Sequence, residues 1–408
     1  MYTLLARRDF RTFIAGQTLS TLGDHAVFVA LGVWVKELTG SSSAAGLVLL
    51  AYTAPLLLLP VGGYLADRFP RRPVLLVTNL SLVLGSLPLL TVDGPSDAWV
   101  IHAVAAGYGL ASAVTGPALS AVLRELVSGE ADFGAAAALS QSVRSAVTLL
   151  APLLGASLLG WAGGRAFTLV NMALLLGAVA AFLLLKGEGA AAPPQAPAPV
   201  DVMGGLRHLR ASEGIRRLLV ALTALTFAVG LLQPMLYTLI EDGLRRDPRF
   251  MGVLETVLAV GSLAGSVAGG FLIGRLGPRR MVMTGAALFG AGAGLLLVAE
   301  LPVVLAGLVI TGAAIPAAVI GLATAAQAAT PARLMGRMQA VVNLCLTVPQ
   351  ALSLGVGSAL VAVLSFRQVT AVMIAGAAVS ALLLGRPGVR DAVGRRVPDR
   401  RPSTDPMT

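Results

Sequence analysis

Long apolar runs, separated by short polar segments, are the dominant pattern along the chain. A helix needs about 20 mostly apolar residues to cross the hydrocarbon core of a bilayer, and twelve runs are close to this length or longer. They cover 12–35, 44–66, 73–92, 98–122, 133–160, 166–185, 215–240, 250–274, 281–299, 302–328, 338–364 and 368–385. The pattern predicts an all-α polytopic membrane protein with twelve transmembrane helices.

A long polar interruption divides the predicted spans into two sets of six. Its centre, 189–199, consists almost entirely of alanine and proline, a composition typical of linkers and not of packed cores. We therefore expect a first six-helix bundle over 1–186, a cytoplasmic linker over 187–213, a second six-helix bundle over 214–386 and a basic cytoplasmic tail over 387–408.

The composition excludes several classes of protein. Apolar residues make up 56% of the chain and charged residues only 12%, whereas about 25% of residues are charged in an average soluble domain. So few charges could not cover the exterior of a soluble protein of 408 residues. A soluble enzyme, a disordered chain and a disulfide-rich secreted scaffold are thereby excluded. With one cysteine, Cys345, and three histidines, we expect no disulfide and no metal site.

Positive charges gather on one side of the predicted topology. If both termini share a side, that side carries 23 of the 30 lysines and arginines and the opposite side six, with Arg144 inside a span. Lysine and arginine accumulate in cytoplasmic loops, so both termini are expected in the cytoplasm. This distribution accounts for the net charge of +10 without a nucleic-acid partner. The many arginines and alanines are typical of a GC-rich bacterial genome, which favours a bacterial inner membrane as the location.

Two basic loops recur at matching places in the two halves. The glycine pairs that open them lie 207 residues apart, about half the chain length. The first loop, after span two, contains Gly62, Gly63, Asp67, Arg68, Arg71 and Arg72. The second loop, after span eight, contains Gly269, Gly270, Arg275, Arg279 and Arg280. Two parallel six-helix halves are typical of one large class of secondary transporters.

The first loop resembles the signature loop of the major facilitator superfamily, approximately G-x-x-x-D-R-x-G-R-R, with Pro70 in place of the usual glycine. Segments 10–24 and 37–47 are similar to the bacterial branch of macrolide-efflux and enterobactin-exporter-like permeases. The resemblance implies two pseudo-symmetric six-helix bundles and transport by alternating access. It also implies a monomer without a cofactor, driven by a proton gradient, with membrane lipid and a small amphipathic substrate as partners.

The resemblance further implies a gate in the first loop. Asp67 would meet the start of span eleven near Arg337 and lock the two halves in the outward-facing state, and breaking this contact would permit alternating access. The second loop has Gly274 where the first has Asp67, so only the first can supply this carboxylate. The alternative is that the arginines of the loop do no more than hold it in the cytoplasm.

Ionisable groups inside the bilayer are functional candidates by default. Asp24 and Arg144 are both predicted about 18 Å or slightly less from the cytoplasmic ends of spans one and five, which are neighbours in the superfamily. Either Asp24 carries a proton with Arg144 as a movable partner, or the two form a static ion pair, or they do not touch. Glu255, near the outer end of span eight, is the third coupling candidate, with a snorkelling carboxylate as the alternative.

The predicted substrate cavity contains few polar groups. By resemblance, spans one, four, seven and ten line it, and spans two, five, eight and eleven form the seam between the halves. The candidate lining residues are Gln17, Tyr108, Gln141, Gln233, Tyr237, Asn343 and Gln350. Mostly neutral polar groups among apolar side chains suit amphipathic molecules better than sugars or phosphates.

These observations predict proton-coupled efflux of amphipathic small molecules of a drug, antibiotic or siderophore type. An uptake carrier or an uncoupled facilitator of the same fold is the alternative. Ser157 and His102 leave an intramembrane protease as a remote alternative, which twelve spans and the two-half repeat oppose. The chain is therefore expected not to be an enzyme, and the lack of a G-x-x-x-x-G-K-[ST] motif excludes an ATP-driven pump.

Overall fold

A computed structural model describes residues 7–58, 68–127, 130–185, 213–329 and 335–385, and every element within these ranges is a helix. The predicted all-α class is thus confirmed. The first half contains α2 (Arg8–Thr39), α3 (Ser42–Thr53), η1 (Ala54–Leu58), α5 (Arg71–Ser86), η2 (Leu87–Thr91), η3 (Pro95–Asp97), α6 (Ala98–Leu126) and α7 (Glu130–Leu183). The second half contains α9 (Glu213–Gly230), α10 (Leu232–Thr238), η4 (Leu239–Gly243), η5 (Pro248–Phe250), α11 (Met251–Leu296), α12 (Leu301–Ala329), α13 (Met335–Leu360) and α14 (Phe366–Gly385).

Two helices are twice as long as one membrane crossing. α7 has 54 residues and turns at Gly163, where φ is 80°. α11 has 46 residues and turns at Gly277, where φ is 74°. A side chain is disfavoured at such positive φ values, so glycine is the residue that permits each turn. Each of these helices therefore holds two spans, in agreement with the predicted breaks at 161–165 and 275–280.

The described helices are consistent with twelve crossings. Eight of them are long and apolar enough to cross a membrane, and the two that turn at a glycine cross twice. The shorter apolar helices Ser42–Leu58 and Cys345–Leu360 supply the remaining two crossings. These correspond to the predicted spans two and eleven.

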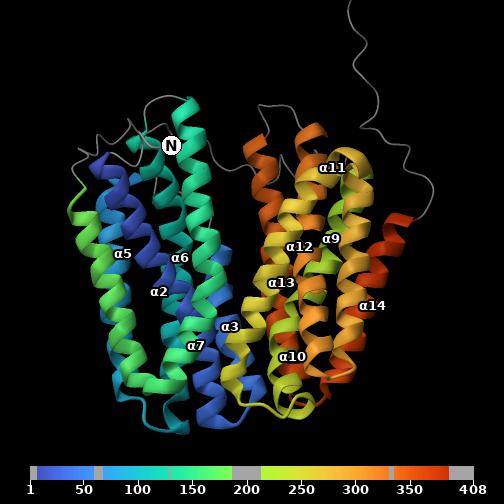
Figure 1. Cartoon of the computed structure of the whole chain (residues 1–408), viewed down its shortest axis with the longest axis horizontal. Coiled ribbons are helices and arrows are strands. Elements are labelled where there is room, and N and C mark those ends of the chain that lie inside the picture. Colours follow the sequence, from blue (N-terminus) through green and yellow to red (C-terminus); the bar gives the residue numbers. More distant parts are fainter. Residues whose placement is uncertain (1–6, 59–67, 128–129, 186–212, 330–334, 386–408) are drawn as a thin grey trace, which may run out of the picture.

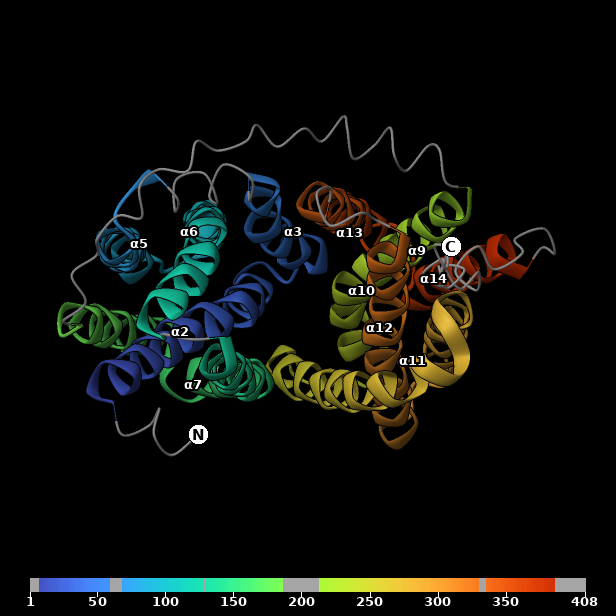
Figure 2. The same cartoon turned by 90° about the horizontal axis from the view of Figure 1, so that it is seen from above.

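The two halves stand side by side and meet along a seam of four helices (Figures 1 and 2). α3 packs against α13, and α7 packs against α11. The contacts are close, because a Cβ atom on Gly46 of α3 would lie 3.1 Å from the Cβ atom of Ser358 on α13. On the other side of the seam, a Cβ atom on Gly252 of α11 would lie 2.8 Å from the Pro152 carbonyl oxygen. Spans two, five, eight and eleven thus form the seam, as the resemblance implies.

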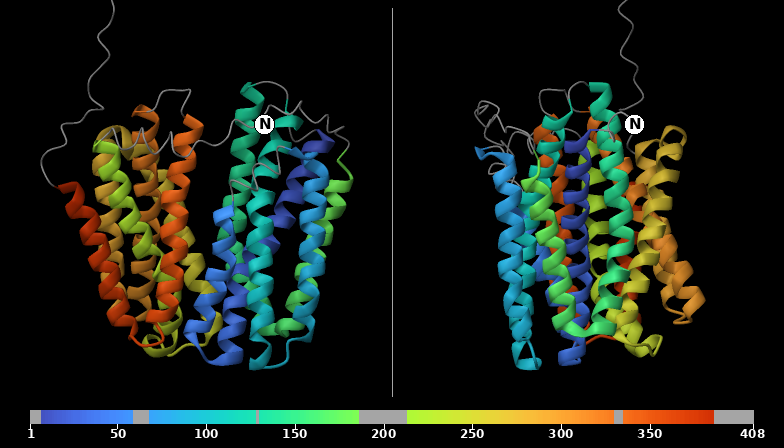
Figure 3. Two further views of the ribbon diagram at one scale, coloured as in Figure 1. Left: turned by 180° about the vertical axis from the view of Figure 1, so that it is seen from behind. Right: turned by 60° about the vertical axis from the view of Figure 1, so that its left-hand side comes forward.

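The halves converge at one end of the molecule only. We call the end where α2 begins the Arg8 end and the opposite end the Thr39 end. The ribbons of the two halves meet at the Thr39 end and diverge toward the Arg8 end (Figures 1 and 3). α14 ends at the Arg8 end as well, so both described chain ends lie on that side.

Glycine allows α11 and α12 to pack backbone against backbone. Gly261 and Gly265 on α11 face the backbone of Val309 and Ala313 on α12. A Cβ atom on Gly269 would lie 2.7 Å from Cδ1 of Ile320 on the same helix. Small residues four apart are the usual means of close helix contact in membranes. The two glycines of the second loop therefore differ in their surroundings. Gly269 packs against α12, whereas no atom lies within 4 Å of the position that a Cβ atom on Gly270 would take.

Gly265→Ala is expected to lower the stability of the protein, and Gly270→Ala is its matched control. The new methyl group at 265 would overlap the Ala313 backbone, and such overpacking costs about 1–3 kcal/mol. The same change at 270 meets open space and gains helix propensity. Melting temperatures in one detergent should fall for Gly265→Ala and hold or rise for Gly270→Ala. Equal melting temperatures for the two variants would contradict this account of the α11–α12 contact.

Candidate functional site

Two ion pairs join the halves at the Thr39 end. Lys36, at the end of α2, pairs with Glu241 of η4. The next residue, Glu37, accepts a hydrogen bond from Nε of Arg249 on η5 at 2.7 Å. We call Lys36, Glu37, Glu241 and Arg249 the latch. Lys36 and Glu37 are adjacent and oppositely charged, and each contacts a residue of opposite charge in the second half. The two pairs together fix how the halves are aligned at this end.

Lys36 is the most buried member of the latch, with a side chain that is 4% exposed. Its Nζ also donates to the Gly40 carbonyl oxygen at 2.8 Å and to Oγ of Ser42 at 2.9 Å. A buried ammonium group is costly unless it is paired and hydrogen-bonded, and here three acceptors surround it. Lys36 and Arg249 are two of the six positive charges on the outer side of the predicted topology, and the sequence signal for this contact is the Lys36-Glu37 doublet at a span end.

Three predicted site residues lie close to the latch. Glu255 is 8% exposed and accepts a hydrogen bond from Nε2 of Gln233 at 3.2 Å. Tyr237 is 1% exposed, lies against Gly32 of the first half, and its hydroxyl has no hydrogen-bond partner among the described residues. The snorkelling interpretation of Glu255 is therefore wrong, because the carboxylate is buried between α10 and α11.

Asp24 lies at a junction of three helices in the first half. Its Oδ2 atom accepts a hydrogen bond from Oγ of Ser112 on α6 at 2.8 Å. The Ser112 hydroxyl is also 3.3 Å from the hydroxyl of Tyr52 on α3. The other carboxylate oxygen, Oδ1, is buried and has no hydrogen-bond partner among the described residues. Asp24 thus connects α2 to α6 and, through Ser112, to the seam helix α3.

The predicted ion pair between Asp24 and Arg144 is not formed. Arg144 instead lines a pocket of about 180 Å³ near the Arg8 end, between α2, α6 and α7. Gln17 and Gln141, both predicted cavity residues, line the same pocket. The structure therefore brings three of the predicted residues together, but apart from Asp24.

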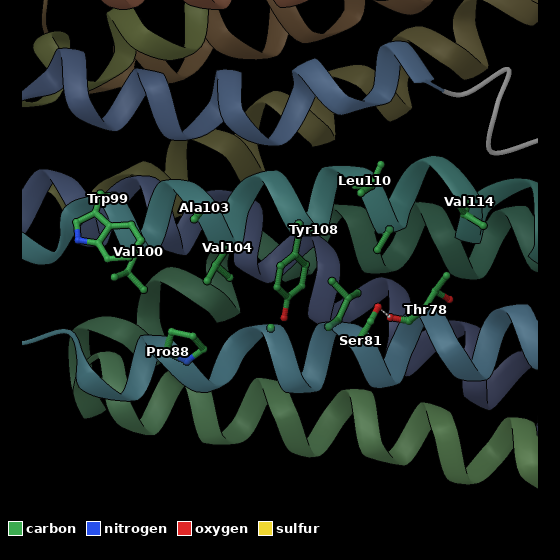
Figure 4. A pocket seen from close by; sticks show the side chains of 14 residues that line it. Thr78, Ser81, Pro88, Trp99, Val100, Ala103, Val104, Tyr108, Leu110 and Val114 are labelled. Atoms are coloured by element: carbon green, nitrogen blue, oxygen red, sulfur yellow. Dashed lines mark hydrogen bonds between the residues drawn. The ribbon is translucent and has the colours of Figure 1, made fainter.

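A larger groove runs between α5 and α6 (Figure 4), with a volume of about 630 Å³ and mostly apolar walls. Trp99 and Leu110 on its rim are 69% and 51% exposed, so the groove faces outward from the bundle. Tyr108 points from α6 toward α5, and its hydroxyl is hydrogen-bonded to Ser86 at 3.0 Å and to Asn171 at 2.5 Å. The predicted cavity residue Tyr108 therefore borders this groove, with its polar atom turned inward.

The remaining cavity candidates lie on α13. Gln350 is exposed on this helix. Asn343 belongs to the same helix, but its side chain is outside the part of the chain that the structure describes.

The two basic loops share a contact that the sequence did not reveal. Arg72 donates from Nε to the Phe182 carbonyl oxygen at 2.9 Å and also contacts the Leu183 carbonyl oxygen, at the end of α7. Arg279 donates from Nε to the Leu384 carbonyl oxygen at 2.9 Å, at the end of α14. The last carbonyls of a helix lack partners within it and attract positive charge. One arginine of each loop therefore caps the last helix of its own half.

The other loop residues have separate places. Arg71 pairs with Glu125 at the end of α6. Arg68, Arg275 and Arg280 are exposed. Gly62, Gly63 and Asp67 lie outside the described residues, as do the linker up to residue 212 and the predicted tail. The proposed contact between Asp67 and the start of span eleven therefore stays a prediction.

The family model of the Major Facilitator Superfamily matches residues 13–244 and 218–405. An uncharacterized MFS-type transporter, YfiS of Bacillus subtilis (strain 168), is 26% identical over 181 residues, which cover 44% of this chain and 42% of that protein. The lysophospholipid transporter LplT of Cronobacter sakazakii (strain ATCC BAA-894) is 29% identical over 192 residues, covering 47% of this chain and 46% of that protein. The chain thus matches about half the length of each relative, and neither one confirms the macrolide-efflux or enterobactin-exporter branch.

Solved structures share the fold over nearly the whole chain. The nucleoside transporter NupG has a TM-score of 0.79 at 12% identity and covers 92% of this chain and 99% of its own. A bacterial homologue of the iron transporter ferroportin, in an inward-facing state, has a TM-score of 0.72 at 16% identity, covering 92% of this chain and 98% of its own. At such identities the likeness establishes the fold alone.

Opening of the Thr39 end is expected to become easier when Lys36 is replaced by methionine. The change removes the cross-half ion pair and leaves Glu241 without its partner. We expect a cysteine placed at the buried seam position Ser358, in a Cys345→Ala background, to react at least about fivefold faster with a membrane-impermeant maleimide.

The control for this experiment is Arg165→Gln. Arg165 forms an exposed ion pair with Asp93 at 2.7 Å, and both residues belong to the first half. Its removal should leave the labelling rate unchanged. Equal acceleration by Arg165→Gln and Lys36→Met would show that the latch does not hold the halves together.

Proposed function

The chain belongs to the major facilitator superfamily, and we propose from this premise that it exports amphipathic small molecules in exchange for protons. The superfamily consists of multi-pass membrane transporters and not of enzymes. We place the protein in a bacterial inner membrane, as a monomer with both termini in the cytoplasm, because its positive charges favour that orientation. In this orientation the Arg8 end faces the cytoplasm and the latch closes the outer end.

The observation that supports proton coupling is the environment of Asp24. A carboxylate within a span is costly to bury and marks a functional site by default. Asp24 forms no ion pair with a described arginine or lysine, and the donors that face it among the described residues are the neutral hydroxyls of Ser112 and Tyr52, with His25 as its titratable neighbour. A proton arriving at Asp24 therefore has no fixed cation to displace.

Two hydroxyl groups connect Asp24 to the seam between the halves. Ser112 links Asp24 to Tyr52 on α3, and α3 packs against α13 of the second half. A change in the charge of Asp24 alters the acceptor that Ser112 faces, and with it the hydrogen bond to α3. We propose that this chain of contacts couples protonation to the relative position of the halves.

The substrate class rests on the polarity of the cavity predicted from the sequence and on one relative. Few polar side chains, set among apolar ones, suit amphipathic molecules. The relative LplT is a lysophospholipid transporter by name, so amphipathic lipids join drugs, antibiotics and siderophores as substrate classes to test. Uptake or uncoupled passage of the same molecules is the alternative function.

Asp24→Asn is expected to abolish proton-coupled transport. Inverted vesicles that contain the protein and hold an inside-acidic pH gradient would be followed with a pH-sensitive dye. Macrolides, siderophore-like compounds, lipophilic cations and lysophospholipids would be added in turn. At least one compound should collapse the gradient with the unaltered protein and not with Asp24→Asn.

Asp242→Asn is the matched control, because Asp242 is an exposed carboxylate of the second half. This variant should behave like the unaltered protein. If Asp24→Asn dissipates the gradient as fast as the control, Asp24 is not the coupling residue. If no compound has any effect, uptake or another driving ion becomes the better proposal.

A further inference from the structure

The groove between α5 and α6 lies on the lipid-facing side of the first half. Seen from above, both helices are at the outer edge of that half, away from the seam (Figure 2). Both belong to segments long and apolar enough to cross a membrane, and Trp99 and Leu110 on the rim are largely exposed. In the bilayer the groove therefore opens to lipid and not to water, and its shape determines which part of a lipid can enter it.

Two glycines widen the groove. Gly85 of α5 and Gly107 of α6 both line it, and both are exposed. Neither has a positive φ, and no described atom lies within 4 Å of the position that a Cβ atom on either glycine would take. Glycine within a helix costs about 0.5–1 kcal/mol relative to alanine. Here that cost permits neither a turn nor a close helix contact, and what the two glycines provide is open space.

The hydroxyl groups on the walls of the groove already have partners within the protein. Thr78 donates to the Val74 carbonyl oxygen at 2.9 Å, and Ser81 donates to the Thr78 carbonyl oxygen at 2.8 Å. The Tyr108 hydroxyl is hydrogen-bonded inside the bundle. The rest of the wall is mostly apolar. Because a hydrocarbon chain needs no hydrogen-bond partner, these walls suit hydrocarbon better than a polar ligand.

The dimensions of the groove fit one hydrocarbon chain. It extends along α6 from Trp99 to Val114 (Figure 4), a length of about 22 Å at the rise of a helix. Spread over this length, the volume of about 630 Å³ corresponds to a mean width of about 6 Å. A hydrocarbon chain is about 4–5 Å wide at van der Waals contact, whereas a helix with its side chains is about 10–12 Å wide. A single chain can therefore enter the groove and a helix of another protein cannot.

The groove also has the depth of one leaflet. Half of a bilayer, with its headgroup region, is about 20–22 Å thick, which matches the length along α6. Trp99 lies at the Thr39 end of α6, and Trp161, which is 90% exposed, lies at the same end, next to the turn of α7. Tryptophan gathers at the level of the lipid headgroups. A chain in the groove thus has its headgroup beside Trp99 and its terminal methyl group toward Val114.

We propose that this groove binds one acyl chain of a phospholipid from the leaflet at the Thr39 end, which is the outer leaflet in the orientation proposed above. The bound chain fills the space between α5 and α6 and contacts both helices. It is a resident lipid and not the transported molecule, because the groove opens away from the seam. The inference therefore does not depend on the proposed proton exchange.

The test maps where a photoreactive acyl chain contacts the protein. The full chain would be placed in phosphatidylcholine nanodiscs that contain a small fraction of phosphatidylcholine with a diazirine on one acyl chain, irradiated, digested and analysed by mass spectrometry. Labelling of 78–88 and 99–114 should exceed labelling of α14 at least about fivefold, which corresponds to about 1 kcal/mol of preference. α14 is the reference surface, because Val379 and Leu382 on it are also exposed and do not line the groove.

The position of the diazirine tests the direction of the chain in the unaltered protein. A diazirine near the ester group should label residues close to Trp99, and one near the terminal methyl group should label residues close to Val114. The opposite order would contradict the assignment to the leaflet at the Thr39 end.

Gly85→Leu combined with Gly107→Leu should remove the excess labelling, because the new side chains begin in open space and occupy the groove. Gly270→Leu is the matched control, with the same change at an exposed glycine of α11 that also meets open space, and it should leave the labelling unchanged. The melting temperature of the double variant in detergent should hold or rise, since glycine is replaced by a better helix former.

Three results would overturn the inference. Equal labelling of the groove and of α14 would show only the lipid that covers any membrane surface. Unchanged labelling in a folded double variant would mean that the groove does not hold the chain. Labelling of the groove below that of α14 would show that this face is shielded from lipid, as by a second copy of the chain.

Discussion

The hydrocarbon core of a bilayer contains no water, so each polar group on a span must find its partner within the protein. This constraint accounts for much of the polar structure described above. Arg72 and Arg279 are hydrogen-bonded to the last carbonyls of the helices beside them, and Gln17 is hydrogen-bonded twice to Ser140. Against this background the exceptions are informative. Five buried side-chain atoms have no such partner among the described residues: Oδ1 of Asp24, Asn79 and Asn171, the hydroxyl of Tyr237 and Oγ of Ser380. Unsatisfied groups of this kind are costly to keep, and Asp24 is the one among them that can carry a charge.

The architecture was predictable because it depends on patterns with long repeats. The length of the apolar runs, about twenty residues, follows from the thickness of the bilayer. The 207-residue spacing of the glycine pairs follows from the repetition of the two halves. The breaks at Gly163 and Gly277 were visible as short polar interruptions. The role of each loop arginine was not visible, because the carbonyls that Arg72 and Arg279 contact lie more than 100 residues away along the chain and any sequence offers backbone carbonyls.

Asp24 and Arg144 show why depth in the membrane does not predict a contact. Both were predicted at a similar distance from the cytoplasmic ends of their spans, but the register between α2 and α7 is set by side-chain contacts. Gln17 meets Ser140 and His25 lies 3.5 Å from Thr148, and both pairs are 123 residues apart. Arg144 is therefore level with Thr21, three residues or about 4.5 Å from Asp24 along the helix axis. Asp24 meets Ser112 on α6 instead.

The positions of these groups suggest how the two ends of the molecule are connected. α2 carries Gln17 near the Arg8 end, Asp24 in its middle and Lys36 at the Thr39 end. The same helix therefore lines the small pocket, holds the Asp24 carboxylate and takes part in the latch. A helix with continuous internal hydrogen bonds moves as a rigid rod over this length. A tilt of α2 relative to α6 that breaks the contact between Lys36 and Glu241 therefore also shifts Asp24 relative to Ser112. Opening of one end and a changed environment for the central carboxylate are then two consequences of one movement, which is the coupling that the proposed proton exchange requires.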